Sequence, residues 1–197
     1  LVTMVSVGGL YADNFSNIMA NDDVQKKLIT NIGKFLKFYQ LDGIELNWPK
    51  PMSDENYENS GEQYNTFITN LSNHLKSLSV EHNKRYWLSV TLPFYPVKRS
   101  LWDPALVKDS VDFYTINTYL LHGSWNNEAY LQSPLYSNPN KENLEQVVIE
   151  QSIRYYLVNS IPSNQLIFNV APIATGWQFN QDQFPDLYEP VEGMVKG

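Results

Sequence analysis

The side chains best suited to chemistry gather at the end of one short apolar run. Along Gly43–Trp48, Glu45 and Asn47 share one parity, so both point to the same face of a predicted strand. A carboxylate can exchange a proton with a substrate, and an amide can hold a polar ligand by hydrogen bonds. Pro49 follows directly and ends the strand, because proline has no N–H to donate to a ladder.

A second set of candidates is aromatic. Aromatic residues make up 14% of the chain, and their rings either fill a core or form flat platforms on which sugar rings sit. Tyr119 ends another predicted strand and is expected to line a groove, while His122 and Trp125 follow in a loop. For Trp48, a core role and a platform role both remain open.

These candidates are positioned by an alternation of strands and helices. The predicted strands are Leu1–Val7, Gly43–Trp48, Tyr86–Leu92, Val111–Tyr119 and Gln165–Val170. The predicted helices start at a cap at Asp22 or Asp23, at Glu62 and at Lys141, and the last two run to Leu78 and Val158. The tail after Trp177 has no clear period. Such alternation implies parallel strands, in a barrel or a doubly wound sheet, with the chemistry at their carboxyl ends.

Four segments at strand ends resemble the family 18 glycoside hydrolases, which include chitinases and chitinase-like proteins. They are the Ser-x-Gly-Gly signature at Ser6–Gly9, the fourth-strand motif Asp-Gly-x-Asp-x-Asp-Trp-Glu at Asp42–Pro49, the sixth-strand segment at Tyr114–Trp125 and the seventh strand at Gln165–Trp177. The resemblance implies an α/β fold, a TIM (β/α)8-type barrel. It is apparently incomplete, with strands 3 to 7 and their helices, and residues 1–197 form one partial barrel domain.

The resemblance also implies that the acid-base machinery is lost. In this family, one Glu protonates the leaving oxygen while the substrate's own acetamido group attacks, with help from a neighbouring Asp. Here the acid position is Pro49 and the assisting Asp is Asn47. Glu45 replaces a further Asp, and only Asp42 is kept. On the sixth strand, Leu120 stands where the family has Asp.

Three functions follow from this pattern. The leading hypothesis is an inactive chitinase-like lectin that binds N-acetylglucosamine oligomers through Trp48, Tyr119, Trp125, Trp177, Asn47 and Glu45. The second is a residual glycosidase in which Asp54 or Glu55 supplies a relocated acid. The third is a structural or protein-interaction scaffold that binds no sugar.

Composition narrows the partners. The net charge of −7 and the absence of any long Lys/Arg run disfavour nucleic acid and anionic membranes. No apolar stretch approaches the roughly 20 residues of a membrane span. With no Cys there is neither a disulfide nor a thiolate zinc site, and no His cluster indicates another metal, so no cofactor is expected.

The resemblance implies an extracellular protein. It also leaves no room for the first two strands of the barrel, so apolar faces should stay uncovered. We therefore expect a piece of a longer protein, a barrel completed by another chain, or a monomer of marginal stability.

Overall fold

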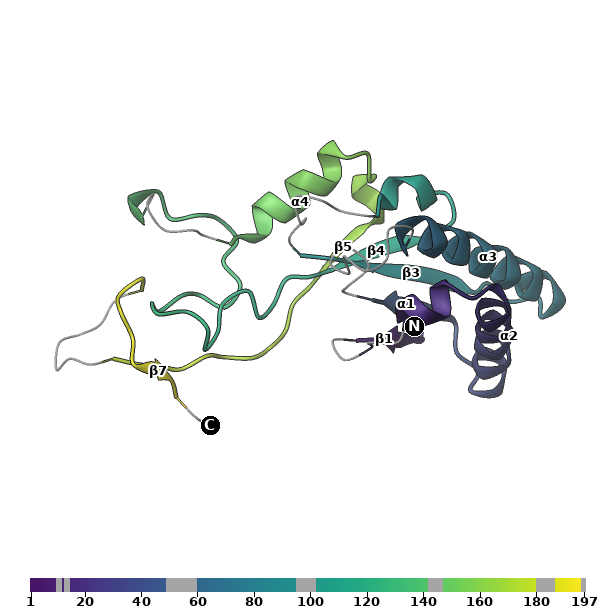
Figure 1. The fold of residues 1–197 in the computed structure, drawn as a ribbon, viewed down its shortest axis with the longest axis horizontal. Coiled ribbons are helices and arrows are strands. Elements are labelled where there is room, and N and C mark those ends of the chain that lie inside the picture. The colour runs from purple at the N-terminus through teal and green to yellow at the C-terminus, as the bar shows by residue number, and fades with distance from the viewer. Residues whose placement is uncertain are drawn as a thin grey trace.

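One parallel sheet organises the chain (Figure 1). A computed structural model describes residues 1–9, 12, 15–48, 60–94, 102–141, 147–179 and 187–195. The order of strands across the sheet follows the order along the chain, β1-β2-β3-β4-β5, and every neighbouring pair is parallel. These strands are β1 (Met4–Gly8), β2 (Gly43–Asn47), β3 (Trp87–Leu92), β4 (Phe113–Asn117) and β5 (Leu166–Asn169).

Helices connect the parallel strands, as the predicted alternation requires. The α-helices are α1 (Phe15–Met19), α2 (Asp22–Phe38), α3 (Ser60–Glu81) and α4 (Ile149–Val158). Short 3-10 turns are η1 (Pro104–Val107), η2 (Pro139–Lys141) and η3 (Ser163–Gln165). In Figure 1, α2 and α3 lie side by side next to the first three strands. Helix α4 is joined to the segment after β3, because the hydroxyls of Tyr156 and Ser152 donate to the carbonyls of Pro93 and Phe94.

The core lies between the sheet and these helices. Alternate residues of each strand face the helices, so the apolar members of every strand enter one layer. In β2, β3 and β4 they are almost completely buried and include Ile44, Leu46, Leu88, Val90, Leu92, Tyr114 and Ile116. From the helices they meet Ile32, Leu36, Tyr64, Phe67, Ile68 and Leu71. The opposite face of the sheet is left to the intervening, mostly polar residues.

The N-cap of the first long helix lies one residue before the predicted cap. Asn21 is the N-cap, and its side-chain oxygen accepts hydrogen bonds of 3.1 Å from the amides of Asp23 and Val24. Asp22 and Asp23 instead occupy the first turn, where a negative charge is favoured by the helix dipole. The predicted cap at Asp22 or Asp23 was therefore wrong by a residue, since asparagine caps as well as aspartate.

The predicted helix from Lys141 starts later than its sequence pattern suggested. Val147 and Val148 are not helical, and α4 begins at Ile149. The amide of Ile149 donates to the carbonyl of Pro134 at 2.9 Å. This contact with a distant segment satisfies an N–H group that a helix start would otherwise leave free, so tertiary structure sets the boundary.

An apolar groove stays open at the β1 edge of the sheet. It has a volume of about 210 Å³, and seven of its eight lining residues are apolar. They come from β1 (Val5, Val7), β2 (Ile44) and α2 (Leu28, Ile32, Phe35, Leu36), with Asn31 as the polar member. Phe35 is 44% exposed. The expectation that an incomplete barrel leaves apolar surface uncovered agrees with this groove.

A small lobe extends from the carboxyl ends of β4 and β5. We call residues 119–136, 171–179 and 187–195 the lobe (Figure 1, left). Its tail, which showed no period in the sequence, forms a short antiparallel pair of β6 (Trp177–Gln178) and β7 (Gly193–Met194). A bridge between Glu128 and Pro190 joins the tail to the loop after β4. Within the described residues, no helix is both long and apolar enough to span a membrane.

Candidate functional site

The face of the sheet away from the helices carries a polar cluster near the carboxyl ends of β2, β3 and β4. Glu45 and Asn47 share this face, as their parity predicted. The Oγ1 of Thr115 donates to Oε1 of Glu45 at 2.6 Å, and the hydroxyls of Thr115 and Thr91 lie 3.1 Å apart. Both threonines are more than nine-tenths buried. The carboxylate of Glu45 is therefore fixed across three strands.

The hydrogen-bond partner of Glu45 lies two strands away in the sheet, on Thr115 of β4. The reason is the longer side chain of Glu, which reaches past β3 to β4. Thr91 and Thr115 were missed as site residues, although each alternates with apolar neighbours in its strand and so had to share the polar face.

Asn47 is held through its backbone by the two glycines at the end of β1. The amide of Gly9 donates to the carbonyl of Asn47 at 2.7 Å. Gly8 has φ +126° and Gly9 has φ +102°, conformations that side chains rarely adopt. A Cβ at Gly8 would lie 2.0 Å from the Asn47 carbonyl oxygen. Gly8 and Gly9 therefore serve the backbone geometry at the end of β1.

Replacing Gly8 by alanine should therefore cost more stability than replacing Gly9. Gly8→Ala adds a collision to backbone strain, and we expect it to lower the free energy of unfolding by about 3 kcal/mol or more. A Cβ at Gly9 meets nothing within 4 Å, so Gly9→Ala should cost only the strain, about 1–2 kcal/mol. Urea unfolding of both variants measures the two losses of stability. Equal losses would show that the close approach of Gly8 to the Asn47 carbonyl does not affect stability.

Asp42 belongs to the opposite end of β2, far from the polar cluster. Its carboxylate accepts hydrogen bonds from the amide and hydroxyl of Thr3, at 2.7 and 2.8 Å, and pairs with Lys84 at 2.8 Å. The Lys84 ammonium, followed by the Thr3 donors, holds the pKa of Asp42 well below its ordinary value of 3.8. Asp42 thus ties the starts of β1, β2 and β3 together, which is a structural task.

The low pKa of Asp42 makes this joint acid-sensitive. A depressed pKa stabilises the fold fully above pH 3.8, the unfolded value, and this stabilisation is lost as the pH falls further. We expect Asp42→Asn to be less stable than the parent at pH 7 and the difference to shrink below about pH 4. Asp23→Asn, in an exposed 3.7 Å pair with Lys26, is the control and should change little. Urea midpoints measured from pH 7 to pH 3 test this, and a pH-independent difference would contradict it.

Trp48 lies in the core and not at a surface. Its side chain is 2% exposed, its ring stacks on Phe15 with centroids 5.2 Å apart, and it meets Tyr64 edge-on at 5.1 Å. Tyr64 in turn contacts Trp102 at 5.1 Å. Of the two roles left open for Trp48, the structure gives it the packing role. The residues directly after it, including Pro49, Asp54 and Glu55, lie outside the described residues.

Beyond β4, the chain turns at a strained leucine. Tyr119 is half-buried at the end of the strand, and Leu120 has φ +56° with its side chain 54% exposed. A leucine in this left-handed conformation costs about 1 kcal/mol and persists only where neighbours hold it. Below it, Nδ2 of Asn169 donates to Oδ1 of Asn117 at 2.8 Å, which adds amide groups to the polar face.

Trp125 is the exposed aromatic platform among the candidates. Its side chain is 64% exposed, and its six-membered ring lies so close to Gly123 that a Cβ there would come within 2.5 Å of it. The six-membered ring of the indole thus packs closely against Gly123. The amide of Gly123 donates to Oδ1 of Asn126 at 2.9 Å, and the amide of Asn126 donates to the Gly123 carbonyl at 2.9 Å. This turn holds the ring beside an open surface.

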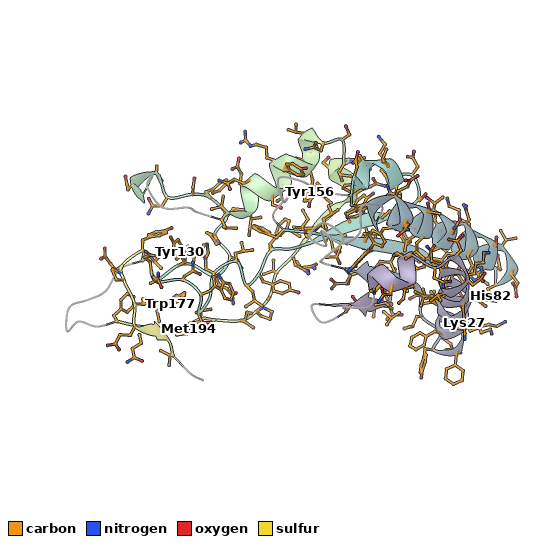
Figure 2. The ribbon with its side chains drawn as sticks, viewed as in Figure 1. Lys27, His82, Tyr130, Tyr156, Trp177 and Met194 are labelled. Atoms are coloured by element: carbon orange, nitrogen blue, oxygen red, sulfur yellow. The ribbon has the colours of Figure 1, made fainter. Side chains whose placement is uncertain are left out.

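Trp177 connects two segments of the lobe and is not a free aromatic platform. Its Nε1 donates to the carbonyl of Tyr130 at 3.1 Å, and its side chain is half-buried (Figure 2). Tyr130 contacts Tyr188 edge-on and stacks on His122. Tyr130 carried no signal in the sequence, because it lies in a loop without periodicity. The four candidate aromatic residues therefore divide into a core residue, a strand-end residue, a platform and a lobe residue.

Comparisons with known proteins agree with this architecture. The family model of the glycosyl hydrolases family 18 matches residues 1–193. Chitinase 1 of Aphanocladium album is 22% identical over 98% of this chain and 45% of its own length. The chain thus spans about half the length of that curated relative.

Solved structures show the same fold. A family 18 chitinase from Cycas revoluta, in complex with (GlcNAc)3, superposes with a TM-score of 0.86 at 17% identity over 99% of this chain and 56% of that one. A chitinase-like agglutinin from Robinia pseudoacacia gives a TM-score of 0.85 at 16% identity over 100% of this chain and 58% of that one. The predicted partial α/β barrel is confirmed.

Proposed function

The chain belongs to the glycosyl hydrolases family 18, and from this premise we propose that it is a non-catalytic member that binds N-acetylglucosamine oligomers. The observation that carries the proposal is a platform without an acid. The side chain of Trp125 is 64% exposed in the segment after β4, while the motif position of the proton-donating Glu is Pro49.

Loss of hydrolysis follows from the residue types at three positions. A glycosidic oxygen leaves at neutral pH only when a general acid protonates it, and proline has no ionisable group. Asn47 replaces the Asp that would stabilise a developing positive charge, and an amide cannot neutralise it. Leu120 removes a further carboxylate. Glu45 keeps a negative charge but is engaged with Thr115, and Asp42 lies at the opposite end of β2.

Retention of sugar binding is supported by what remains. A sugar ring presents an apolar face of C–H groups that packs on an indole, and its hydroxyl and acetamido groups need hydrogen-bond partners. Trp125 supplies the flat surface. Tyr119, Asn47 and Glu45 supply phenol, amide and carboxylate groups near the carboxyl ends of the strands. The same fold occurs in the chitinase-like agglutinin from Robinia pseudoacacia.

A titration with chitohexaose tests the proposal. We expect a saturable change in tryptophan fluorescence, because the Trp125 indole changes its solvent contact when a sugar stacks on it. Cellohexaose, which has no acetamido groups, is the matched control and should bind more weakly. If the fluorescence does not change up to about 1 mM chitohexaose, the binding free energy is weaker than about −4 kcal/mol. That result would reject sugar binding and favour the scaffold alternative.

The residual-glycosidase alternative has its own test. It requires a carboxyl group to act as the acid, and Asp54 and Glu55 are the nearest ones in sequence after Pro49. Turnover of chitohexaose that disappears in Asp54→Asn or Glu55→Gln would establish it and would overturn our proposal.

We further propose that the barrel is completed by polypeptide outside these 197 residues, from the same or another chain, and that the protein is extracellular. Support for completion comes from the groove beside β1, where α2 covers one side of the strand and nothing among the described residues covers the other. A strand followed by an amphipathic helix would extend the repeat there. The isolated chain should therefore bind the apolar dye ANS, and Phe35→Lys should reduce the signal. An unchanged signal would argue against completion at this groove.

A further inference from the structure

The loop that carries Trp125 is packed around a buried histidine. His122 is 2% exposed, and its ring stacks face to face on Tyr130, with centroids 4.2 Å apart and an interplanar angle of 6°. Its Nε2 lies 3.3 Å from the carbonyl oxygen of Val147. The same loop is joined to the tail of the lobe, since the amide of Ala129 donates to the carbonyl of Glu189 at 2.9 Å. His122 thus links the loop after β4 to the segment that precedes α4.

The surroundings of His122 suit a neutral ring. When Nε2 donates to the Val147 carbonyl, Nδ1 carries a lone pair, and this buried atom has no hydrogen-bond partner among the described residues. A second proton on the ring would bring a charge into this site. Burial lowers the pKa of His122 and outweighs the opposite effects of the Val147 carbonyl and the Asn126 side chain.

We propose that neutral His122 is a positioning residue that holds the Trp125 platform in place, so that ligand binding weakens as the loop takes up a proton. This inference rests on the proposed sugar-binding function. Gly123, against which the Trp125 ring lies, is the next residue after His122. If His122 moves away from Tyr130, Gly123 moves with it, and the Trp125 ring loses the surface against which it packs.

The sign of the pH dependence follows from linkage. A histidine whose pKa is lowered on folding stabilises the packed arrangement fully above the unfolded value, about 6.5. This contribution is lost as the pH falls from about 6.5 toward the folded pKa. The described elements packed against His122 present Tyr130, Asn126 and the Val147 carbonyl. Tyr188 lies behind Tyr130, and among the described residues no carboxylate or ammonium group is hydrogen-bonded to the ring.

The first test needs no sugar. In the 197-residue chain, the three histidines are followed by NMR from pH 8 to pH 4.5 and assigned with His74→Gln, His82→Gln and His122→Phe. We expect the His122 resonance to titrate below pH 6.5 and the Trp125 indole N–H signal to shift with the same midpoint. A His122 pKa at or above 6.5, or a Trp125 signal that ignores it, would overturn the inference even if sugar binds.

The second test links the proton to the ligand. Chitohexaose affinity should fall by roughly threefold or more between pH 7.5 and pH 5 in the parent chain. His122→Phe keeps an aromatic ring against Tyr130 but cannot titrate, so its affinity should stay flat, whereas His74→Gln should follow the parent.

A parallel fall in His122→Phe would refute the role of His122, while absence of binding at every pH would count against the proposed function and leave the NMR result standing.

Discussion

Trp125→Ala is expected to abolish measurable chitohexaose binding while leaving the fold intact. The indole is 64% exposed, packs against Gly123 and is not part of the hydrophobic core, so the core loses little when it is removed. A central aromatic contact typically contributes about 2 kcal/mol or more, which weakens binding by about 30-fold. Isothermal titration calorimetry with chitohexaose measures the affinity, and urea unfolding measures the stability.

Two companion variants make this result specific. Trp125→Phe keeps a smaller aromatic face and should retain part of the affinity. Leu131→Ala changes another exposed apolar residue in the same loop, 50% exposed, and should bind like the parent. If Trp125→Ala binds as tightly as the parent, the ligand does not use this platform. If it unfolds, Trp125 has a structural role that its exposure does not suggest.

Trp48→Ala should produce the reverse pattern, a large loss of stability. Its side chain is 2% exposed between the rings of Phe15 and Tyr64. Removing an indole from such a site leaves a cavity, and the expected cost is about 3–5 kcal/mol. Urea unfolding of the variant measures this loss, and Trp48→Phe, which refills part of the space, should lose less.

The comparison between the two tryptophans is more informative than either alone. We expect chitohexaose affinity to depend on Trp125 and the free energy of unfolding to depend on Trp48. A Trp48→Ala variant that keeps its stability but loses its affinity would mean that Trp48 faces a ligand. That result would contradict the packing of Phe15, Trp48 and Tyr64 described above.

Much of the fold could be predicted from the sequence because its signals are local. The apolar stripe of α2 and the short apolar runs of the strands fix element types, and Glu45 and Asn47 share a face because they are two residues apart. The face of Trp48 follows the same parity, with Ile44 and Leu46 in the core. The sequence left the role of Trp48 open, because parity alone does not say which face of the strand meets the helices.

The parts that sequence missed depend on contacts between distant segments. The start of α4 is set by the carbonyl of Pro134, which lies well before Ile149 in the sequence. The bond between Glu45 and Thr115 joins β2 to β4 across β3. The indole N–H of Trp177 donates to the carbonyl of Tyr130, a residue far away in the sequence. Neither residue lies in a segment with a helical or strand period. No local pattern encodes these pairings.

The central claim is that this family 18 member binds its ligand without cutting it, and one sample can test both halves. The chain is incubated with a stoichiometric amount of chitohexaose at pH 7.5 for a day, the bound fraction is separated by ultrafiltration, and the sugar is examined by mass spectrometry. We predict that the hexamer is retained with the protein and recovered intact, at the same level as in a protein-free control. Shortened oligomers above that control would contradict the claim and show that a catalytic acid is present.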